Sequence, residues 1–433
     1  MSNKFFLYVF LVIICNFKYS YANELTFKII EKSLGINKSF NASKQNLKAI
    51  EENLNISRSE FLPSVELSTS LSSNESTNQT DQSGVSTSDT NLDTETNSIS
   101  VEQKIFQGFK GINQLKKSNL EISKANYELK QKEQETIINI VESFSNLIFY
   151  FENKNFNLEN KNLLERQVEF DNARLQKGEI TLTDLAQSES SLAGAQANLT
   201  TAETNYLVAL SNFKKTTGMA EPDISALSYN YELSLPNSLS ESLILSSKFN
   251  IDLKISELNF LISSLNYDIE KAKLSPSASL NFTKSESKDF SSSIDEVDKE
   301  TLKATIKWPL IKGGKNFSEI KKAKHIKSKN KLLFEDKRDS VKTSTTNAWS
   351  EYISAKSVLL STSSQVKAAE IANEGITLEY DSGNTRTTLE VIQSRSFLLD
   401  SKINNSEAKR DLIVTKFKLL AETGKLSLNS LKQ

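Results

Sequence analysis

Two long stretches of the sequence contain neither glycine nor proline. The first lies between Gly111 and Gly178, and the second lies between Gly314 and Gly375. Because glycine and proline are the residues that most disfavour a helix interior, each stretch predicts one uninterrupted helix. A helix of about 65 residues is about 100 Å long at 1.5 Å per residue. The chain is therefore expected to build rods, which no compact domain could contain.

The sequence also repeats itself. Asp184-Leu185 recurs as Glu390-Val391, and Lys215–Gly218 aligns with Ala421–Gly424, about 206 residues apart. We predict a tandem duplication in which each copy runs helix, proline-led strand, polar loop, strand, very long helix, helix. The boundaries follow from the repeated motifs and the prolines: a first copy over 23–220, a linker over 221–237 and a second copy over 238–433.

The N-terminus has the pattern of a secretory signal peptide. Lys4 is followed by an apolar run from Phe5 to Cys15, and a small-x-small site ends at Ala22. The run is shorter than the roughly 20 residues that a transmembrane helix needs. We expect residues 1–22 to be a signal peptide. Lipidation at Cys15 is the alternative, although Ile14 stands where a small residue is usual.

Composition excludes several classes of function. Lys+Arg number 53 and Asp+Glu 54, so the formal charge is only −1, whereas nucleic-acid binding needs a clustered basic excess. One His and one Cys rule out most hydrolytic triads and most His/Cys metal sites. A hydrophobic content of 37% suits elements that bury only a stripe. We expect no enzyme, no cofactor, no metal and no nucleic-acid partner.

The predicted helices carry apolar residues at seven-residue spacing. Such a seam predicts helices that supercoil and pack knobs into holes. The one polar member, Asn405, is expected to fix the register of its pair. A purely structural coiled-coil hairpin would show the same periodicity. The seam residues are Ile137, Val141, Phe144, Ile148 and Phe151 in one helix, Leu185, Leu192, Leu199, Tyr206 and Phe213 in the next, and Val391, Leu398, Asn405, Leu412 and Leu419 in the second copy.

Four segments alternate between apolar and polar residues with a period of two. We predict strands at 63–72, 98–106, 276–284 and 301–309, each with one apolar and one polar face. Their length, near ten residues, fits a tilted membrane crossing, in which Trp308 would lie at the membrane interface. The two joining segments are long and polar, as loops outside a cell are. A soluble sheet with one wet face is the alternative.

Four strands are too few to close a pore. About eight strands are the practical minimum for a barrel, and an open sheet edge is not tolerated in lipid. If the strands cross a membrane, the protein must therefore oligomerise, and a homotrimer would supply twelve strands. The fold class predicted is mainly α with a small β part: four long coiled-coil rods and four outer-membrane strands. The competing interpretation is a secreted periplasmic coiled-coil scaffold or adaptor without a pore.

Four motifs together resemble the TolC-like outer membrane efflux and secretion channels: Phe61-Leu62-Pro63, Leu274-Ser275-Pro276, Ile311–Gly314 and Thr385–Val391. The resemblance implies a homotrimer with a twelve-strand barrel in the outer membrane and a twelve-helix tunnel in the periplasm. It also implies no catalysis. The implied partners are a periplasmic membrane-fusion adaptor and an inner-membrane transporter of the RND, MFS or ABC type. Drug efflux and type I protein secretion are both compatible with it.

The resemblance further implies a gate at the periplasmic tip. Arg386 matches a residue of the family that links inner and outer helices, and its acidic partner matches Asp184, with Thr183 beside it. The family's tip tyrosine is replaced by Asp381, with Tyr380 next to it. We expect Arg386 to pair with Asp184 in the resting state. The plain alternatives are that Arg386 is a solvated side chain and that Asp184 caps its helix.

The resemblance implies acidic residues in the narrowest ring of the tunnel. Glu390 matches one of them, but the second falls at Gln393, so this mouth would carry fewer negative charges. Thr387-x-x-Glu390 also has the spacing of a capping box. A cap and a pore ring are compatible, since both place a carboxylate at the tip.

Overall fold

The structure, a computed structural model, describes residues 28–86, 88–219, 233–291, 294–382 and 386–431. The predicted signal peptide and most of the predicted linker lie outside these residues. The chain divides into two compact units. One comprises residues up to 44, 127–254 and 337 onward, and the other comprises 45–126 and 255–336.

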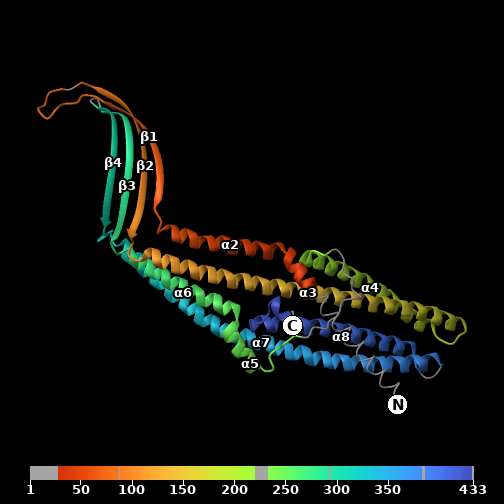
Figure 1. Cartoon of the computed structure of the whole chain (residues 1–433). Helices are drawn as coiled ribbons and strands as arrows, with labels where there is room; N and C mark the ends of the chain where they lie inside the picture. Colours follow the sequence, from red (N-terminus) through yellow and green to blue (C-terminus); the bar gives the residue numbers. More distant parts are fainter. Residues whose placement is uncertain (1–27, 87, 220–232, 292–293, 383–385, 432–433) are drawn as a thin grey trace, which may run out of the picture. The chain divides into compact units, whose positions relative to one another are not determined.

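The second unit contains one antiparallel sheet in the order β1-β2-β3-β4 (Figure 1). The strands are longer than predicted, because the polar segments read as loops continue the ladder. Side-chain bonds such as Thr96 with Ser287 and the Thr94 hydroxyl with the Asp289 carbonyl accompany the backbone bonds there. The bounds are β1 Ser64–Ser76, β2 Thr90–Phe106, β3 Ser277–Ser291 and β4 Ile294–Lys307, with helices α2 Lys38–Ser59 and α6 Ile251–Ala272 leading toward β1 and β3.

One face of the sheet is apolar and uncovered within its unit. The register places Val65 opposite Val101 and Phe282 opposite Leu302. On the edge strands several apolar side chains of this face are strongly exposed, with Leu302 at 68% and Ile306 at 79%. Among the described residues of this unit, none covers that face to form a hydrophobic core with it. The soluble-sheet alternative needs such a core.

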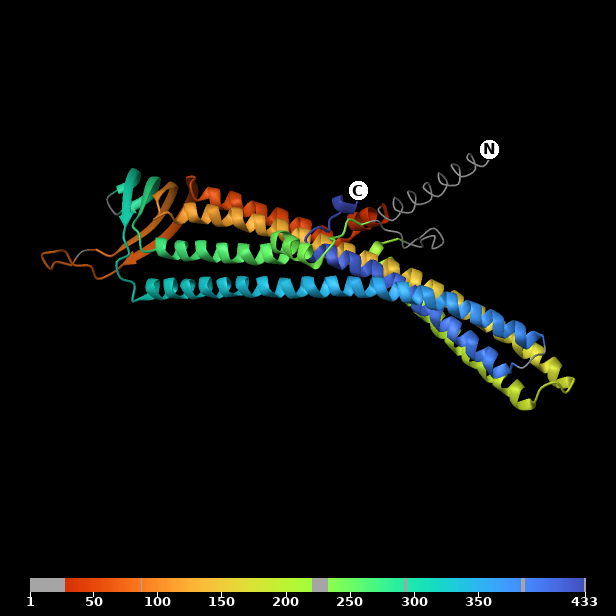
Figure 2. The ribbon, with the colours of Figure 1, turned by 90° about the horizontal axis from the view of Figure 1, so that it is seen from below.

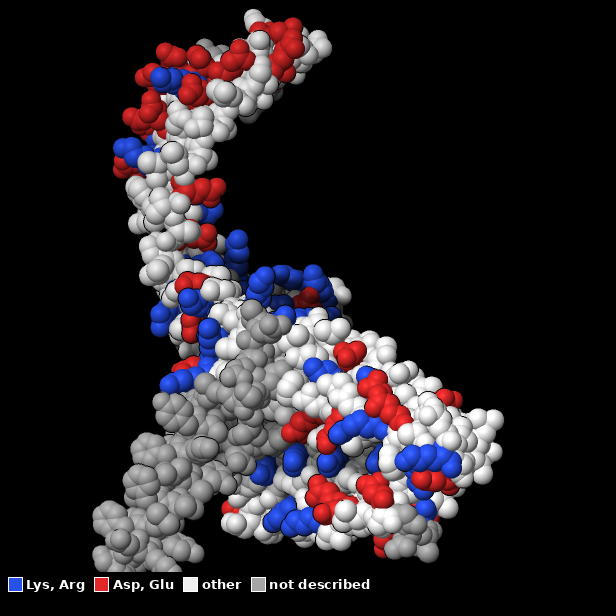
Figure 3. Space-filling view, turned by 90° about the vertical axis from the view of Figure 1, so that its right-hand side faces the viewer, with Lys and Arg blue, Asp and Glu red and all other residues white. Residues whose placement is uncertain are grey.

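The two ends of the sheet carry side chains of opposite charge. Figure 3 shows acidic side chains gathered at the hairpin end and lysines or arginines gathered where the strands meet the helices. The acidic end includes Asp93 and Glu95 on β2 and Asp295 and Glu296 on β4. Charged side chains therefore flank the apolar band at both ends.

The first unit is helical. The helices α3 and α4 form one antiparallel hairpin, and α7 and α8 form another; in Figure 2 the two hairpins lie side by side. The predicted long helices are present, and α7 continues past Gly375. The bounds are α3 Lys110–Gln176, α4 Leu182–Thr217, α5 Leu239–Phe249, α7 Lys315–Asp381 and α8 Thr388–Glu422, followed by a short 3-10 turn at Asn429–Leu431. The prediction of a mainly α chain with a small antiparallel sheet is confirmed.

The heptad seams account for the core of this unit. Ile137, Val141 and Phe144 are almost fully buried, as are Phe213 and Leu419. The outer seam residues Leu192, Leu199, Leu398 and Leu412 are only half-buried in the single chain. The most deeply buried part of this unit is therefore the region where the hairpins contact Ile30, Leu34 and Phe40.

Asn405 has the contacts expected of a register residue. Its side-chain oxygen accepts hydrogen bonds from Thr362 at 3.2 Å and Ser363 at 3.0 Å on α7. A shift of α8 by one residue would leave this half-buried amide without those donors. Among the described residues, no helix is both long and apolar enough to cross a membrane.

Replacing Phe417 with alanine should destabilise the helical unit. Phe417 is fully buried on α8 in a cluster with Ile140 and Ile413, and a buried Phe→Ala change costs about 3–5 kcal/mol because it leaves a cavity. Urea unfolding followed by helical circular dichroism measures the loss. The Phe417→Leu variant, which keeps most of the volume, should lose less. An unchanged midpoint for Phe417→Ala would show that this cluster does not support the unit.

Candidate functional site

The candidate site is the tip of the helical unit, where both hairpins turn. The helices α4 and α8 start with equivalent capping boxes. Thr181 receives a hydrogen bond from the Asp184 amide at 3.3 Å, and the Asp184 carboxylate accepts one from the Thr181 amide at 2.9 Å. Thr387 and Glu390 repeat this arrangement at 3.3 Å and 2.8 Å. Each cap satisfies backbone donors that a helix N-terminus leaves open.

The cap explains the position of Asp184. Its carboxylate also accepts a bond from the Thr181 hydroxyl at 2.7 Å, and the hydrogen bonds from the Thr181 side chain and backbone lower the pKa of Asp184. Thr183 lies exposed on the first turn of α4. The Asp184 carboxylate is thus already hydrogen-bonded to Thr181, the capping residue of its own helix.

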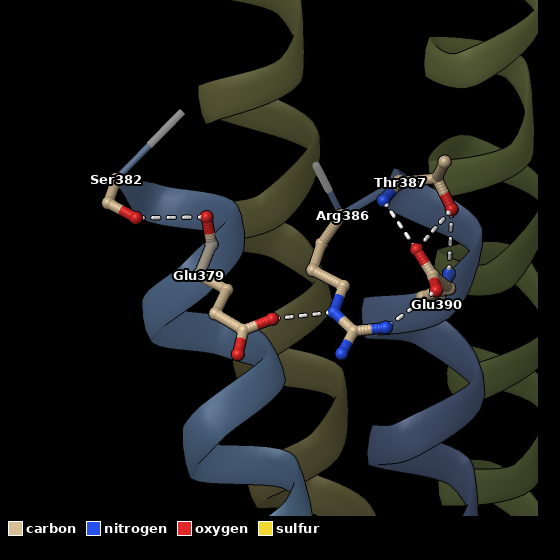
Figure 4. A network of polar contacts seen from close by, with 5 residues as sticks. All are labelled: Glu379, Ser382, Arg386, Thr387 and Glu390. Atoms are coloured by element: carbon tan, nitrogen blue, oxygen red, sulfur yellow. Dashed lines mark hydrogen bonds and ion pairs between the residues drawn. The ribbon is translucent and has the colours of Figure 1, made fainter. Parts of the chain in front are cut away.

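Arg386 forms an exposed ionic clamp (Figure 4). Its Nε donates to Glu379 at the end of α7 at 2.6 Å, and its Nη1 donates to Glu390 on α8 at 3.0 Å. Hydrogen bonds to Glu379 and then Glu390 raise the pKa of Arg386. The Thr387 backbone bond and then Arg386 lower the pKa of Glu390. The clamp holds together the two helices that flank the turn.

The predicted pair between Arg386 and Asp184 is not formed in the chain. Arg386 has two nearer carboxylates on its own hairpin, Glu379 and Glu390, and Asp184 is engaged by its cap. The physical reason is local: short contacts within one hairpin satisfy both groups. Glu390 therefore has two roles, as the cap of α8 and as half of the Arg386 clamp.

Asp171 on α3 is the centre of a buried polar network that joins the four helices. It is fully buried. One carboxylate oxygen accepts bonds from the Tyr380 hydroxyl at 2.7 Å and Gln167 at 3.0 Å, and the other accepts one from Ser188 on α4 at 2.6 Å. A buried carboxylate requires such partners, since desolvation of an unpaired charge is costly.

Two further contacts extend this network to α8. The Tyr380 hydroxyl lies 3.1 Å from the Thr388 hydroxyl, and Arg395 donates to Gln167 at 3.1 Å. Burial raises the pKa of Tyr380, and the Asp171 bond adds to the rise while the Thr388 bond opposes it. Burial also lowers the pKa of Arg395, against the opposing effect of nearby Asp381 and Asp171. The network thus reaches all four helices of the tip.

Tyr380, one of the residues predicted at the gate, lies at the tip with its side chain inside this network. It is buried, whereas its neighbour Asp381 is exposed. Arg174 packs over the Tyr380 ring at 4.9 Å and forms an ion pair with Glu179 at 3.2 Å. Tyr380 is therefore part of the bundle core at the tip.

Asp171 was not among the predicted site residues. Its signal in the sequence is its position seven residues after Leu164, which is also buried. Residues seven apart lie on nearly the same side of a helix, so this spacing indicates that Asp171 shares the buried side of Leu164. Its partner Tyr380 is 209 residues away, and periodicity does not identify such a partner.

The remaining predicted residues lie apart from this network. Gln393 is exposed one turn beyond Glu390 on α8. Trp308, at the helix-proximal end of β4, is 63% exposed and donates a hydrogen bond to the Leu274 carbonyl at 3.1 Å. An indole with a bonded N–H and an exposed ring has the amphipathic character of a membrane-interface residue.

Comparison with known proteins identifies relatives of the chain. Residues 29–219 match the family described as outer membrane efflux protein. The outer membrane efflux protein BepC of Brucella suis is 25% identical over 271 residues, which are 62% of this chain and 58% of BepC. The alignment thus spans less than two thirds of the length of that curated relative.

Solved structures extend the likeness to nearly the whole chain. The CmeC outer membrane channel of Campylobacter jejuni matches with a TM-score of 0.81 at 15% identity, over 92% of this chain and 85% of CmeC. The outer membrane protein VceC of Vibrio cholerae matches with a TM-score of 0.76 at 16% identity, over 92% of this chain and 95% of VceC. These matches show that the chain shares the fold of these two outer membrane proteins. The predicted resemblance to the TolC-like family is confirmed.

Replacing Asp171 with alanine should loosen the tip. The change leaves the buried donors of Ser188, Tyr380 and Gln167 without their acceptor, at about 1–3 kcal/mol for each buried unsatisfied group. Hydrogen exchange of the amides near residues 171, 188, 380 and 388 should speed up, while amides near Phe213 keep their protection. Asp400→Ala, at an exposed position of α8, is the matched control. Equal protection in both variants would contradict the role of Asp171.

Proposed function

We propose that the protein is an outer membrane channel that provides the exit duct of an efflux or type I secretion system. The observation that supports this most strongly is the uncovered apolar face of the sheet, with side chains such as Leu71 and Ile306 each 79% exposed. Lipid is the environment in which such a face is stable. The relatives named above are outer membrane efflux proteins and channels.

A homotrimer is part of the proposal. The strands β1 and β4 each have a single neighbour in the sheet, and unpaired backbone groups at a sheet edge are costly in a bilayer. Pairing β4 of one copy with β1 of the next removes both edges. Three copies give a twelve-strand barrel, and their long helices give a twelve-helix tunnel in the periplasm.

The duct itself performs no catalysis in this proposal. Among the described residues no group of His, Cys, Asp and Glu side chains is arranged to hold a metal ion. We expect the energy to come from an inner-membrane transporter of the RND, MFS or ABC type, joined to the duct by a periplasmic membrane-fusion adaptor. The chemistry of the cargo is then set by that transporter.

The tip supports a role as a gate. The Arg386 clamp is exposed, and exposed ion pairs are weak and screened by salt. It can therefore open without unfolding the bundle. The buried network around Asp171 keeps the two hairpins together when the clamp opens.

A soluble periplasmic scaffold is the competing function. It would require a partner to cover the apolar face of the sheet, and fractionation tests it directly. The proposed channel should enter the outer membrane fraction and migrate as a heat-sensitive oligomer. A scaffold should appear in the soluble periplasmic extract as a monomer. Crosslinking in cells, followed by identification of the attached inner-membrane protein, would distinguish drug efflux from protein secretion.

Removing the clamp should increase opening of the channel. Arg386→Ala breaks the contacts to both Glu379 and Glu390, so open probability or conductance in planar bilayers should rise, by a few fold at most because the pair is exposed. Glu379→Gln should act in the same direction. Lys177→Ala, an exposed lysine at the other turn, should leave the channel unchanged. Wild-type conductance in both clamp variants would reject a gating role for Arg386.

A further inference from the structure

The two free edges of the sheet carry unpaired charges of opposite sign. Glu66 lies on β1, and Lys307 is the last residue of β4. Among the described residues, neither has an opposite charge within ion-pairing distance. Both edges are available for a strand from a second copy, since β1 and β4 are the outer strands.

Glu66 and Lys307 point to the same face of the sheet. The register links Glu66 to Ser100, Ser100 to Thr283 and Thr283 to Thr301 in one row. Lys307 is an even number of residues from Thr301 along β4, so it shares that face. This is the polar face, opposite the one that carries Val65 and Ile306.

The surroundings of each charge within the chain are unfavourable or neutral. Glu66 is opposite Ser100, and its diagonal neighbours on β2 are Ser98 and Glu102. Carboxylates in diagonal positions are close enough to repel. Lys307 is opposite Ser277, which offers no charge. A cation beside Glu66 would therefore relieve a repulsion that the single chain leaves in place.

Glu66 and Lys307 both lie at the helix-proximal end of their strands. The apolar positions start at Val65 on β1, and on β4 they run to Trp308 just beyond its last residue. Within one chain the row of Glu66 meets β4 at Thr301, six residues before Lys307. The seam must therefore be staggered by about six residues for Glu66 of one copy to face Lys307 of the next, and the tilt of the strands in a closed barrel requires a stagger of this kind.

The strand directions permit the pairing. Each neighbouring pair from β1 to β4 is antiparallel, so β4 runs opposite to β1. A β4 strand placed against the β1 strand of another copy therefore makes an antiparallel pair. Both charges would then project into the lumen from adjacent strands, within reach of their long side chains.

We propose that Glu66 of one copy and Lys307 of the next form an ion pair that sets the register of the seam between copies. The inference rests on the proposed trimeric channel and deepens it. The partner is a second copy of this chain, recognised by complementary charge at the opposite edge of its sheet. Each trimer would contain three such pairs, one at every seam.

Disulfide crosslinking tests the register. The only cysteine, Cys15, lies in the predicted signal peptide, so Glu66→Cys with Lys307→Cys introduces an otherwise unique pair. Mild oxidation of outer membranes should give covalent dimers and trimers that disappear on reduction, because neighbouring strands bring Cα atoms within disulfide reach. Glu66→Cys with Lys299→Cys is the control. Lys299 is eight residues up the same face, about 26 Å away, and should not crosslink.

Charge reversal tests the interaction. Glu66→Lys should lower the temperature at which the SDS-resistant oligomer dissociates, and adding Lys307→Glu should restore most of that loss. Adding Lys303→Glu instead should not restore it, because Lys303 lies about 13 Å along the strand. If the variants form membrane oligomers but Glu66→Cys couples to Lys299→Cys, or rescue fails, the seam is wrong. If wild-type protein forms no membrane oligomer, the channel proposal fails first.

Discussion

An amphiphilic sheet with two free edges is the constraint on which the rest of this molecule depends. In water, the apolar face that includes Leu67 and Leu302 would remain exposed, and the outer strands would offer unpaired backbone groups to any other chain. In lipid, the face is stable but the edges are not. In the channel proposed above, association of several copies would satisfy both demands. The long helices would then follow the symmetry of the sheet.

The long-range periodicities of the sequence were sufficient to predict most of the fold. The absence of glycine and proline determined α3 and α7 to within a few residues, except that α7 tolerates Gly375. The strands were underestimated because Asn, Asp, Glu and Ser have low strand propensity. In the structure, cross-strand bonds such as that between Thr69 and Asn97 outweigh the propensity. Pairing partners, which a single strand does not reveal, decide where these strands end.

The site was only partly predictable for the same reason. Caps are local, so Thr387 and Glu390 could be identified from their spacing. The network of Asp171 depends on distant contacts such as those with Ser188, 17 positions away, and Tyr380, 209 positions away, and these follow from how two hairpins pack. Within the single chain, Arg386 and Asp184 have nearer partners than each other: Glu379 and Glu390 for Arg386, and Thr181 for Asp184. Similarity to a family indicates which residue of this chain occupies an equivalent position. It does not indicate which side chain that residue pairs with, because this depends on the neighbours in the folded chain.

The tip also shows how the predicted duplication can place equivalent residues of the two repeats of one chain in contact. Arg174 and Tyr380 occupy equivalent positions in the two copies, given the offset of 206 residues seen elsewhere, and they stack on each other at 4.9 Å. If positions 174 and 380 carried the same residue, two arginine cations or two tyrosine rings would lie against each other. Divergence to a cation and an aromatic ring makes the meeting point favourable. At the positions of Arg386 and Glu379 the first copy has Ile180 and Ala173, so the ionic clamp exists in one hairpin alone. The two turns are therefore held by different ion pairs: Arg174 with Glu179 at the first turn, and Arg386 with Glu379 and Glu390 at the second.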